Sequence, residues 1–131
     1  LNLLVKPNSF TSSFLFSFSS TTIQRTMVKL MANDAEFDET IAQAGEKPVI
    51  IDFTASWCGP CQFIGPKFAA MAEEFPGIIF IKVDVDQCEE TAQKCGISAM
   101  PTFQVFKNKA KVEELVGANE EKLREMITKY A

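Results

Sequence analysis

The chain has 131 residues, a net charge of −4 and a hydrophobic fraction of 47%, which suits one globular domain. The excess of acidic residues argues against nucleic acids and anionic membranes as partners, because both attract surfaces rich in Lys and Arg. The absence of His excludes the Ser-His-Asp and Cys-His catalytic arrangements, and we expect no transmembrane helix because no apolar run reaches about 18 residues.

The first 26 residues differ in composition from the rest. They are rich in Ser, Thr and Phe, contain no acid, and carry only Lys6 and Arg25 as bases. Three interpretations stay open: a mitochondrial transit peptide, a weak secretory signal, and upstream sequence that is not part of the natural protein. We favour the third, because the chain begins with Leu and Met27 opens a domain-like pattern. In each case we expect disorder over 1–26, which has no apolar period to bury, and a folded domain over 27–131.

The remaining pattern predicts alternating strands and helices, in the order β-α-β-α-β-α-β-β-α. Asn33, followed by Glu36, is typical of a helix start with its return partner. This order predicts an α/β fold: a central mixed β-sheet flanked by helices on both faces. The expected strands are 28–31, 49–53, 78–85, 102–106 and 111–116, and the expected helices are 33–45, 59–75, 87–95 and one from Asn119 to the C-terminal end.

A Cys-x-x-Cys pair, Cys58 and Cys61, lies between a buried strand and a helix. The free N–H groups and positive dipole of a helix N-terminus favour a thiolate on Cys58, the form that attacks disulfides. Cys61 lies one turn further on and would resolve the mixed disulfide. A zinc site is the first alternative, but Cys88 and Cys95 have the wrong spacing for the remaining ligands. A structural disulfide between Cys58 and Cys61 is the second alternative to a redox site.

Asp52 is the only charge in the apolar run 49–53. Burial would raise its pKa, which suits a proton acceptor for a buried thiol. The alternative is an acid at the strand end that faces solvent.

The motif Trp57-Cys58-Gly59-Pro60-Cys61, which follows the run 49–53, and Met100-Pro101-Thr102 further on together resemble the thioredoxin family over 28–131. The amino-acid sequence of residues 99–107 and 116–119 is most similar to that of fungal thioredoxins, some of which are allergens. One departure is Thr54, where many members have Trp.

The resemblance implies the thioredoxin fold and a protein-disulfide reductase that carries electrons and maintains cell redox homeostasis. Such a protein binds no cofactor or metal; its redox centre is the Cys58–Cys61 disulfide, recharged by thioredoxin reductase with NADPH. Disulfide-containing client proteins are the other partners. We expect a monomer in the cytoplasm, or in the mitochondrion if 1–26 is a genuine transit peptide.

The resemblance also implies roles for individual residues. Lys82 would be the partner of Asp52, and Pro101 would be a cis-proline that faces the disulfide. Gly117 would leave room for a client. The implied client-binding residues are Trp57, Gly59, Pro60, Met100, Pro101 and Gly117.

Cys88 and Cys95 resemble the non-catalytic pair of animal thioredoxins. Seven residues of helix span about 10.5 Å, and a disulfide needs Cα atoms within about 7 Å, so the pair cannot bridge while the helix persists. Two interpretations stay open: small, partly buried hydrophobic residues, or a regulatory switch that responds to oxidation.

Two other functions compete with a reductase. A disulfide isomerase or oxidase usually has His between its cysteines, where this chain has Pro60. A scaffold without redox turnover usually lacks one active cysteine, and both are present here.

Overall fold

The described part of the chain, residues 27–131 of the computed structural model, has the predicted order of strands and helices, with bounds that differ by no more than three residues. The expected extension over 1–26 lies outside the described residues. The strands are β2 (Val28–Leu30), β3 (Val49–Thr54), β4 (Ile79–Asp84), β5 (Thr102–Lys107) and β6 (Ala110–Val116). The helices are α2 (Asp34–Gln43), α3 (Gly59–Glu74), α4 (Glu89–Lys94) and α5 (Glu120–Thr128).

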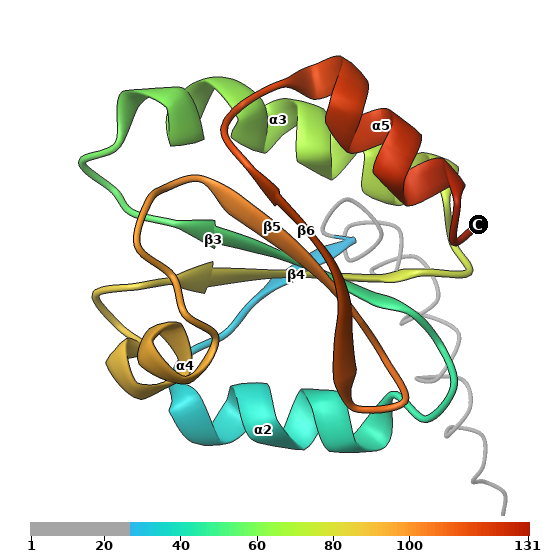
Figure 1. The fold of residues 1–131 in the computed structure, drawn as a ribbon, viewed down its shortest axis with the longest axis horizontal. Coiled ribbons are helices and arrows are strands. Elements are labelled where there is room, and N and C mark those ends of the chain that lie inside the picture. The colour runs from blue at the N-terminus through green and yellow to red at the C-terminus, as the bar shows by residue number, and fades with distance from the viewer. Residues whose placement is uncertain (1–26) are drawn as a thin grey trace, which may run out of the picture.

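The strands form one mixed sheet in the order β2-β4-β3-β5-β6, with helices on both faces (Figure 1). β2, β4 and β3 run parallel, whereas β5 is antiparallel to β3 and β6 is antiparallel to β5. Every residue of β3 is buried, as its apolar sequence predicts for a central strand covered on both sides. The segment with the cysteine motif follows β3 directly. It therefore lies at the edge of the sheet where β3 has its carboxyl end.

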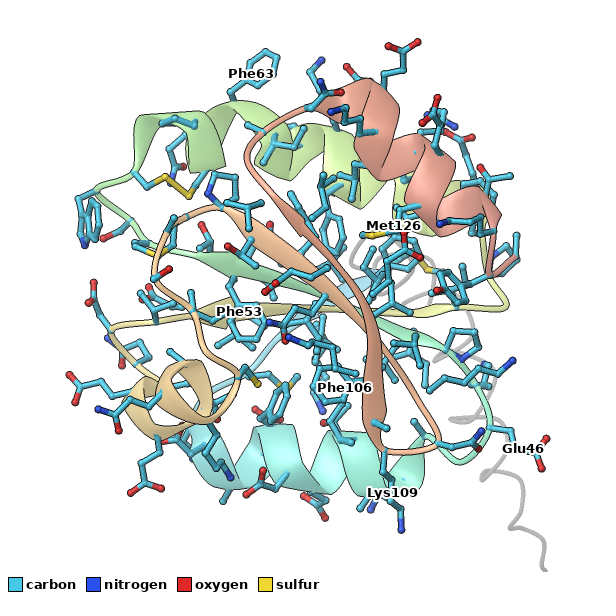
Figure 2. The ribbon with its side chains drawn as sticks, in the orientation of Figure 1. Glu46, Phe53, Phe63, Phe106, Lys109 and Met126 are labelled. Carbon is cyan, nitrogen blue, oxygen red and sulfur yellow. A yellow bond between two sulfur atoms is a disulfide. The ribbon has the colours of Figure 1, made fainter. Side chains whose placement is uncertain are left out.

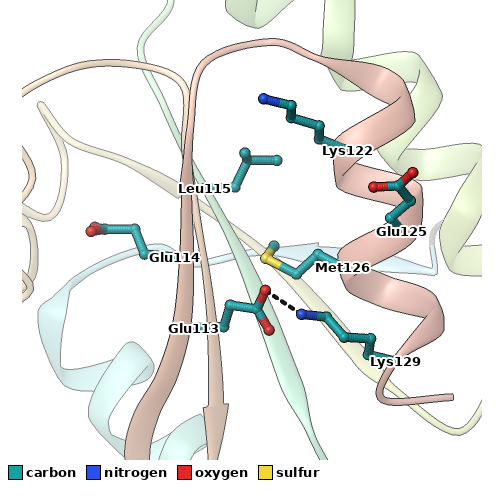
Figure 3. Close-up of a pocket in the computed structure, with 7 residues that line it drawn as sticks. All are labelled: Glu113, Glu114, Leu115, Lys122, Glu125, Met126 and Lys129. Carbon is teal, nitrogen blue, oxygen red and sulfur yellow. Dashed lines mark hydrogen bonds and ion pairs between the residues drawn. The ribbon is translucent and has the colours of Figure 1, made fainter.

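One face of the sheet packs against α3 and α5. Phe68 of α3 lies at the centre of this layer, with its ring centroid 5.1 Å from that of Phe80 and 5.5 Å from that of Phe103. Met126 of α5 points toward the sheet (Figure 2), and it lies beside Leu115 of β6 (Figure 3). Each buried side chain of this size stabilises the fold by about 1.5–3 kcal/mol, so this layer fixes α3 firmly against the sheet.

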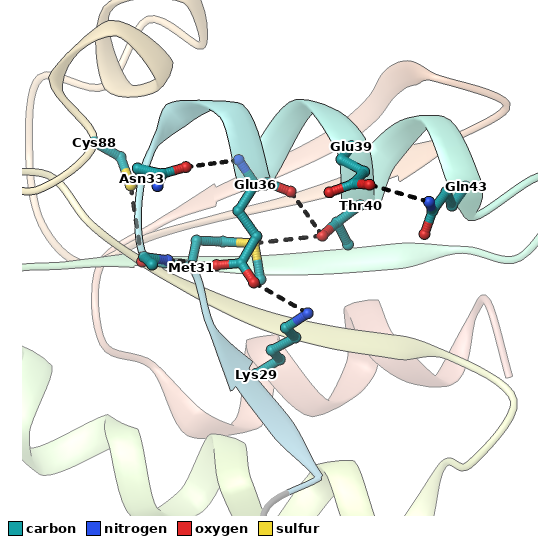
Figure 4. A network of polar contacts seen from close by, with 9 residues as sticks. Lys29, Met31, Asn33, Glu36, Glu39, Thr40, Gln43 and Cys88 are labelled. Carbon is teal, nitrogen blue, oxygen red and sulfur yellow. Dashed lines mark hydrogen bonds and ion pairs between the residues drawn. The ribbon is translucent and has the colours of Figure 1, made fainter.

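The other face packs against α2 and α4, and the start of α2 is capped (Figure 4). The Glu36 N–H donates to Asn33 Oδ1 at 2.8 Å, which confirms the predicted cap. The Glu36 carboxylate accepts from the backbone N–H of Ala32 at 2.6 Å, one residue before the cap itself. A cap of this kind contributes about 1 kcal/mol to helix stability.

The β5–β6 hairpin turns through Asn108 and Lys109, which have φ values of 53° and 69°. Two left-handed residues are what a two-residue hairpin requires, and Asn-Gly is the usual pair. Lys109 therefore occupies a conformation that suits glycine better. No helix within residues 27–131 is long and apolar enough to cross a membrane.

Candidate active site

The two cysteines of the motif are joined by a disulfide at the start of α3. Cys58 is the N-cap of the helix and Cys61 lies in its first turn, with Cα atoms 5.3 Å apart. The Cys61 N–H donates to Cys58 Sγ at 3.2 Å. Pro60 fits this turn because its missing N–H would have no partner there. The helix N-terminus thus presents an N–H group and its positive dipole end to the Cys58 sulfur, where both favour a thiolate.

Both cysteines are largely covered. Cys58 is 6% exposed and Cys61 is 3% exposed, so the difference has the expected direction but is small. They pack in a small cluster with Ala55, Val85 and Met100. The covered side of Cys58 faces the loop before β5, since its Sγ lies 3.7 Å from the carbonyl oxygen of Met100.

That loop contains Pro101, and the Met100–Pro101 peptide bond is cis, as the resemblance implies. The carbonyl of Pro101 accepts a hydrogen bond from the Gly117 N–H at 2.9 Å. Gly117 has a φ of +106°, a conformation that L side chains rarely adopt. This hydrogen bond joins the Met100–Pro101 loop to Gly117, and the loop places the Met100 carbonyl next to the Cys58 sulfur.

Trp57 stands beside the disulfide with 67% of its surface exposed. Its ring N–H donates to Asp86 Oδ2 at 3.0 Å, which fixes the orientation of the indole. Sequence reasoning missed Asp86, because it lies 29 residues away and no local pattern connects the two. Val116, next to Gly117, adds a second exposed apolar side chain.

Asp52 lies on β3 with no exposed surface, which confirms its expected burial. Neither carboxylate oxygen has a hydrogen-bond partner among the described residues. Burial therefore raises the pKa of Asp52 to about 7, against a smaller lowering by the charge of Lys82. A carboxyl that titrates near neutral pH is suited to take up and release a proton.

Lys82 pairs with Asp52 in the register of β4 and β3. No ion pair joins these two side chains in the described structure, so Lys82 acts on Asp52 through its field and not through a direct contact. Lys82 and Cys61 both line a cavity of about 300 Å³, together with Gly65 of α3. Lys82 Nζ lies 3.6 Å from the position that a Cβ on Gly65 would take. Gly65, which sequence reasoning also missed, therefore lines the cavity beside Cys61 at a point where a Cβ would only come into ordinary contact with Lys82.

The family model for thioredoxin matches residues 28–129. The chain belongs to the thioredoxin family. It is 55% identical over 104 residues to the thioredoxin of Geodia cydonium, covering 79% of this chain and 98% of that one. It is 47% identical over 105 residues to the thioredoxin of Mus musculus, covering 80% of this chain and 100% of that one.

Solved thioredoxin structures have the same fold. The thioredoxin of Schistosoma mansoni matches with a TM-score of 0.77 at 43% identity, covering 82% of this chain and 98% of that chain. The thioredoxin of Malassezia sympodialis, described as a member of a pan-allergen family, matches with a TM-score of 0.74 at 42% identity, covering 79% and 90%. The fold expected from the sequence is thus confirmed, and the protein is a thioredoxin disulfide reductase whose redox centre is the Cys58–Cys61 disulfide.

Membership of the thioredoxin family implies two classes of partner, a reductase and proteins with disulfides. Among the described residues, no group of three or more His, Cys, Asp or Glu could hold a metal ion.

The remaining cysteines, Cys88 and Cys95, are free and lie at the two ends of α4 as its caps. Cys88 is buried, with its Sγ 3.9 Å from the Met31 carbonyl oxygen (Figure 4). Burial raises the pKa of both thiols, so each is neutral near pH 7. The intact helix between them keeps them apart, as expected.

Proposed function

We propose that Cys58 attacks the disulfide of a client protein and that Cys61 resolves the mixed disulfide. In the first step the Cys58 thiolate forms a bond to one client sulfur, the client disulfide breaks, and the second client sulfur leaves as a thiolate that takes up a proton. In the second step the Cys61 thiolate attacks Cys58 Sγ and the first client sulfur leaves. The client gains two electrons, and the Cys58–Cys61 disulfide forms. The observation that carries this proposal is the position of Cys58 as the N-cap of α3, with the Cys61 N–H donated to its sulfur.

Asp52 is proposed to accept the proton of Cys61 before the second step. The support is its complete burial, the lack of partners for its oxygens among the described residues, and a pKa raised to about 7 by burial. Lys82 is proposed to stabilise the ionised carboxylate from the neighbouring strand, and the cavity that it shares with Cys61 would give the proton a way to solvent.

The client is proposed to lie across the surface around the disulfide. Trp57 offers an exposed apolar ring, and the Met100 carbonyl lies close to the attacking sulfur. Gly117, without a side chain, leaves space beside the loop. The residues proposed to contact the client are Trp57, Gly59, Pro60, Met100, Pro101 and Gly117.

The partner that recharges the protein is proposed to be a thioredoxin reductase that uses NADPH. The fungal-type subgroup, the monomeric state and the cytoplasmic location stay predictions from the sequence. The identity of 42% to the Malassezia sympodialis protein, against 55% to that of Geodia cydonium, gives the fungal subgroup no added support. Membership of the allergen group described for the former protein is likewise only a prediction for this chain.

The test is insulin reduction by the full chain with thioredoxin reductase and NADPH. Cys58→Ser and Cys61→Ser should each abolish multiple turnover, because one forms no mixed disulfide and the other cannot resolve it. Cys95→Ser is the matched control and should retain the parent rate. Loss of turnover in Cys95→Ser, or full turnover in Cys58→Ser, would overturn the assignment.

A further inference from the structure

The exposed apolar side chains of the described residues are not spread evenly over the surface. The large ones that are at least 40% exposed are Met27, Leu30, Trp57, Phe63, Val112 and Val116. Two of these six are aromatic, and both flank the disulfide: Trp57 directly precedes Cys58, and Phe63 lies two residues after Cys61. The client surface proposed above includes Trp57 but not Phe63, which is 57% exposed.

The fold does not require an aromatic side chain at position 63. Phe63 belongs to none of the three apolar clusters of the core, and Figure 2 shows it projecting from α3 away from the sheet. Its neighbour Gln62 is exposed and polar, as is usual on the solvent side of a helix. Phe also has a lower helix propensity than Gln or Lys. Neither packing of the core nor helix formation therefore explains Phe63.

The ring of Phe63 has a fixed neighbour on one face. The ammonium group of Lys67, one turn further along α3, lies 5.1 Å from the centroid of the ring, where a cation is attracted to the aromatic face. Lys67 Nζ lies 3.5 Å from Glu120 Oε1, at the start of α5. A partner therefore contacts the edge and the opposite face of the ring. Because the ring is already oriented, it loses little conformational freedom when a partner covers it.

Phe63 adjoins the surface that a client must cover. A client disulfide has to reach Cys58, and the next two residues, Gly59 and Pro60, are exposed. Residues three and four apart on a helix are neighbours on its surface. Phe63 follows Pro60 by three residues and Gly59 by four, so it continues the client surface along α3.

We propose that Phe63 determines client specificity by contacting an apolar side chain two residues from the client cysteine under attack. This inference rests on the proposed attack by Cys58. The five steps along the chain from Cys58 to Phe63 span about 7.5 Å of helix. An extended client advances about 3.3 Å per residue and points every second side chain to the same face. The second residue from the attacked cysteine therefore lies about 6.6 Å away, beside the Phe63 ring.

The test uses single turnovers of the pre-reduced full chain on short peptides with one cysteine each. Each peptide is supplied as its symmetric disulfide dimer, so that both sulfur atoms offer Cys58 the same flanking residues. One turnover forms the Cys58–Cys61 disulfide and releases two peptide thiols, which chromatography measures. The reference peptide has Ser two residues before and two residues after the cysteine, and two other peptides have Leu at one of these positions.

We expect at least one Leu peptide to react about fivefold faster than the Ser peptide at subsaturating concentration. Burial of about 40 Å² of apolar surface at about 25 cal/mol per Å² corresponds to this factor. Phe63→Ala should lower this ratio of rates to below about two for a Leu peptide, whereas Phe63→Leu, which keeps an apolar side chain, should retain most of it. A general change in Cys58 reactivity cancels, because the ratio is taken within each variant.

Val112→Ala is the matched control and should keep the ratio of the parent. Val112 is also an exposed apolar residue, but it lies near the hairpin end of β6. Equal rates of the parent on all three peptides, or parent ratios in Phe63→Ala, would overturn this inference and leave the attack by Cys58 intact. Failure of the parent to release thiol from any of the peptides would overturn the proposed function together with this inference.

Discussion

Replacing Asp52 with Asn should change how stability depends on pH. The folded pKa of Asp52 is raised from 3.8 to about 7, so folding binds a proton between these values. The contribution of Asp52 to the free energy of unfolding is therefore highest below about pH 4, and it falls as pH rises toward 7. Above that, the buried charge costs about 4 kcal/mol, from three pKa units at about 1.4 kcal/mol each.

The Asp52→Asn variant lacks this titration. Its free energy of unfolding relative to the parent should rise by about 3 kcal/mol between about pH 5 and about pH 8, whatever constant offset the amide introduces. Urea denaturation of the oxidised proteins, followed by circular dichroism, measures this difference without titration of the active-site thiols, which do not ionise in the disulfide. Glu46→Gln, which removes an exposed carboxylate, is the control. Parallel stability curves for parent and Asp52→Asn over this range would refute the assigned burial cost.

Three further outcomes are expected. Lys109→Gly should stabilise the protein by about 1 kcal/mol in thermal or urea unfolding, because φ is 69° at this position. Asn108→Gly should stabilise it less, since Asn tolerates the left-handed conformation. Equal effects of the two substitutions would argue against backbone strain at Lys109. The midpoint potential of the Cys58–Cys61 couple, measured against glutathione, should lie near the thioredoxin value of about −270 mV, and a value near −180 mV would indicate an isomerase instead. A variant that lacks residues 1–26 should reduce insulin at the parent rate, and a loss of activity would place part of the functional domain in that segment.

The sequence predicts those parts of the fold that depend on local patterns. The apolar run of β3 identifies a central strand, and the one charge within it, Asp52, identifies a buried acid. The helix starts are also local, since Asn33 and Asn119 each accept from an N–H three residues ahead. Cys58 and Cys61 are placed by the strand before them and the helix that they open.

Features that join distant segments had no local signal. The bond from Trp57 to Asp86 spans 29 residues, and the contact of Cys88 with the Met31 carbonyl spans 57. The absence of a direct ion pair between Lys82 and Asp52 depends on side-chain directions that strand register alone does not fix.

The order of attack by Cys58 and Cys61 is the central claim, and trapping of covalent adducts tests it most directly. The Cys58→Ser, Cys61→Ser, Cys88→Ser and Cys95→Ser variants are each reduced, freed of reductant, exposed to the same disulfide-containing protein, and measured by intact mass. Cys61→Ser should accumulate an adduct that a dithiol dissolves, because Cys58 still attacks and nothing resolves the product. Cys58→Ser should form far less, while Cys88→Ser and Cys95→Ser should turn over without accumulation. An adduct that accumulates with Cys58→Ser and not with Cys61→Ser would reverse the two roles and contradict the mechanism.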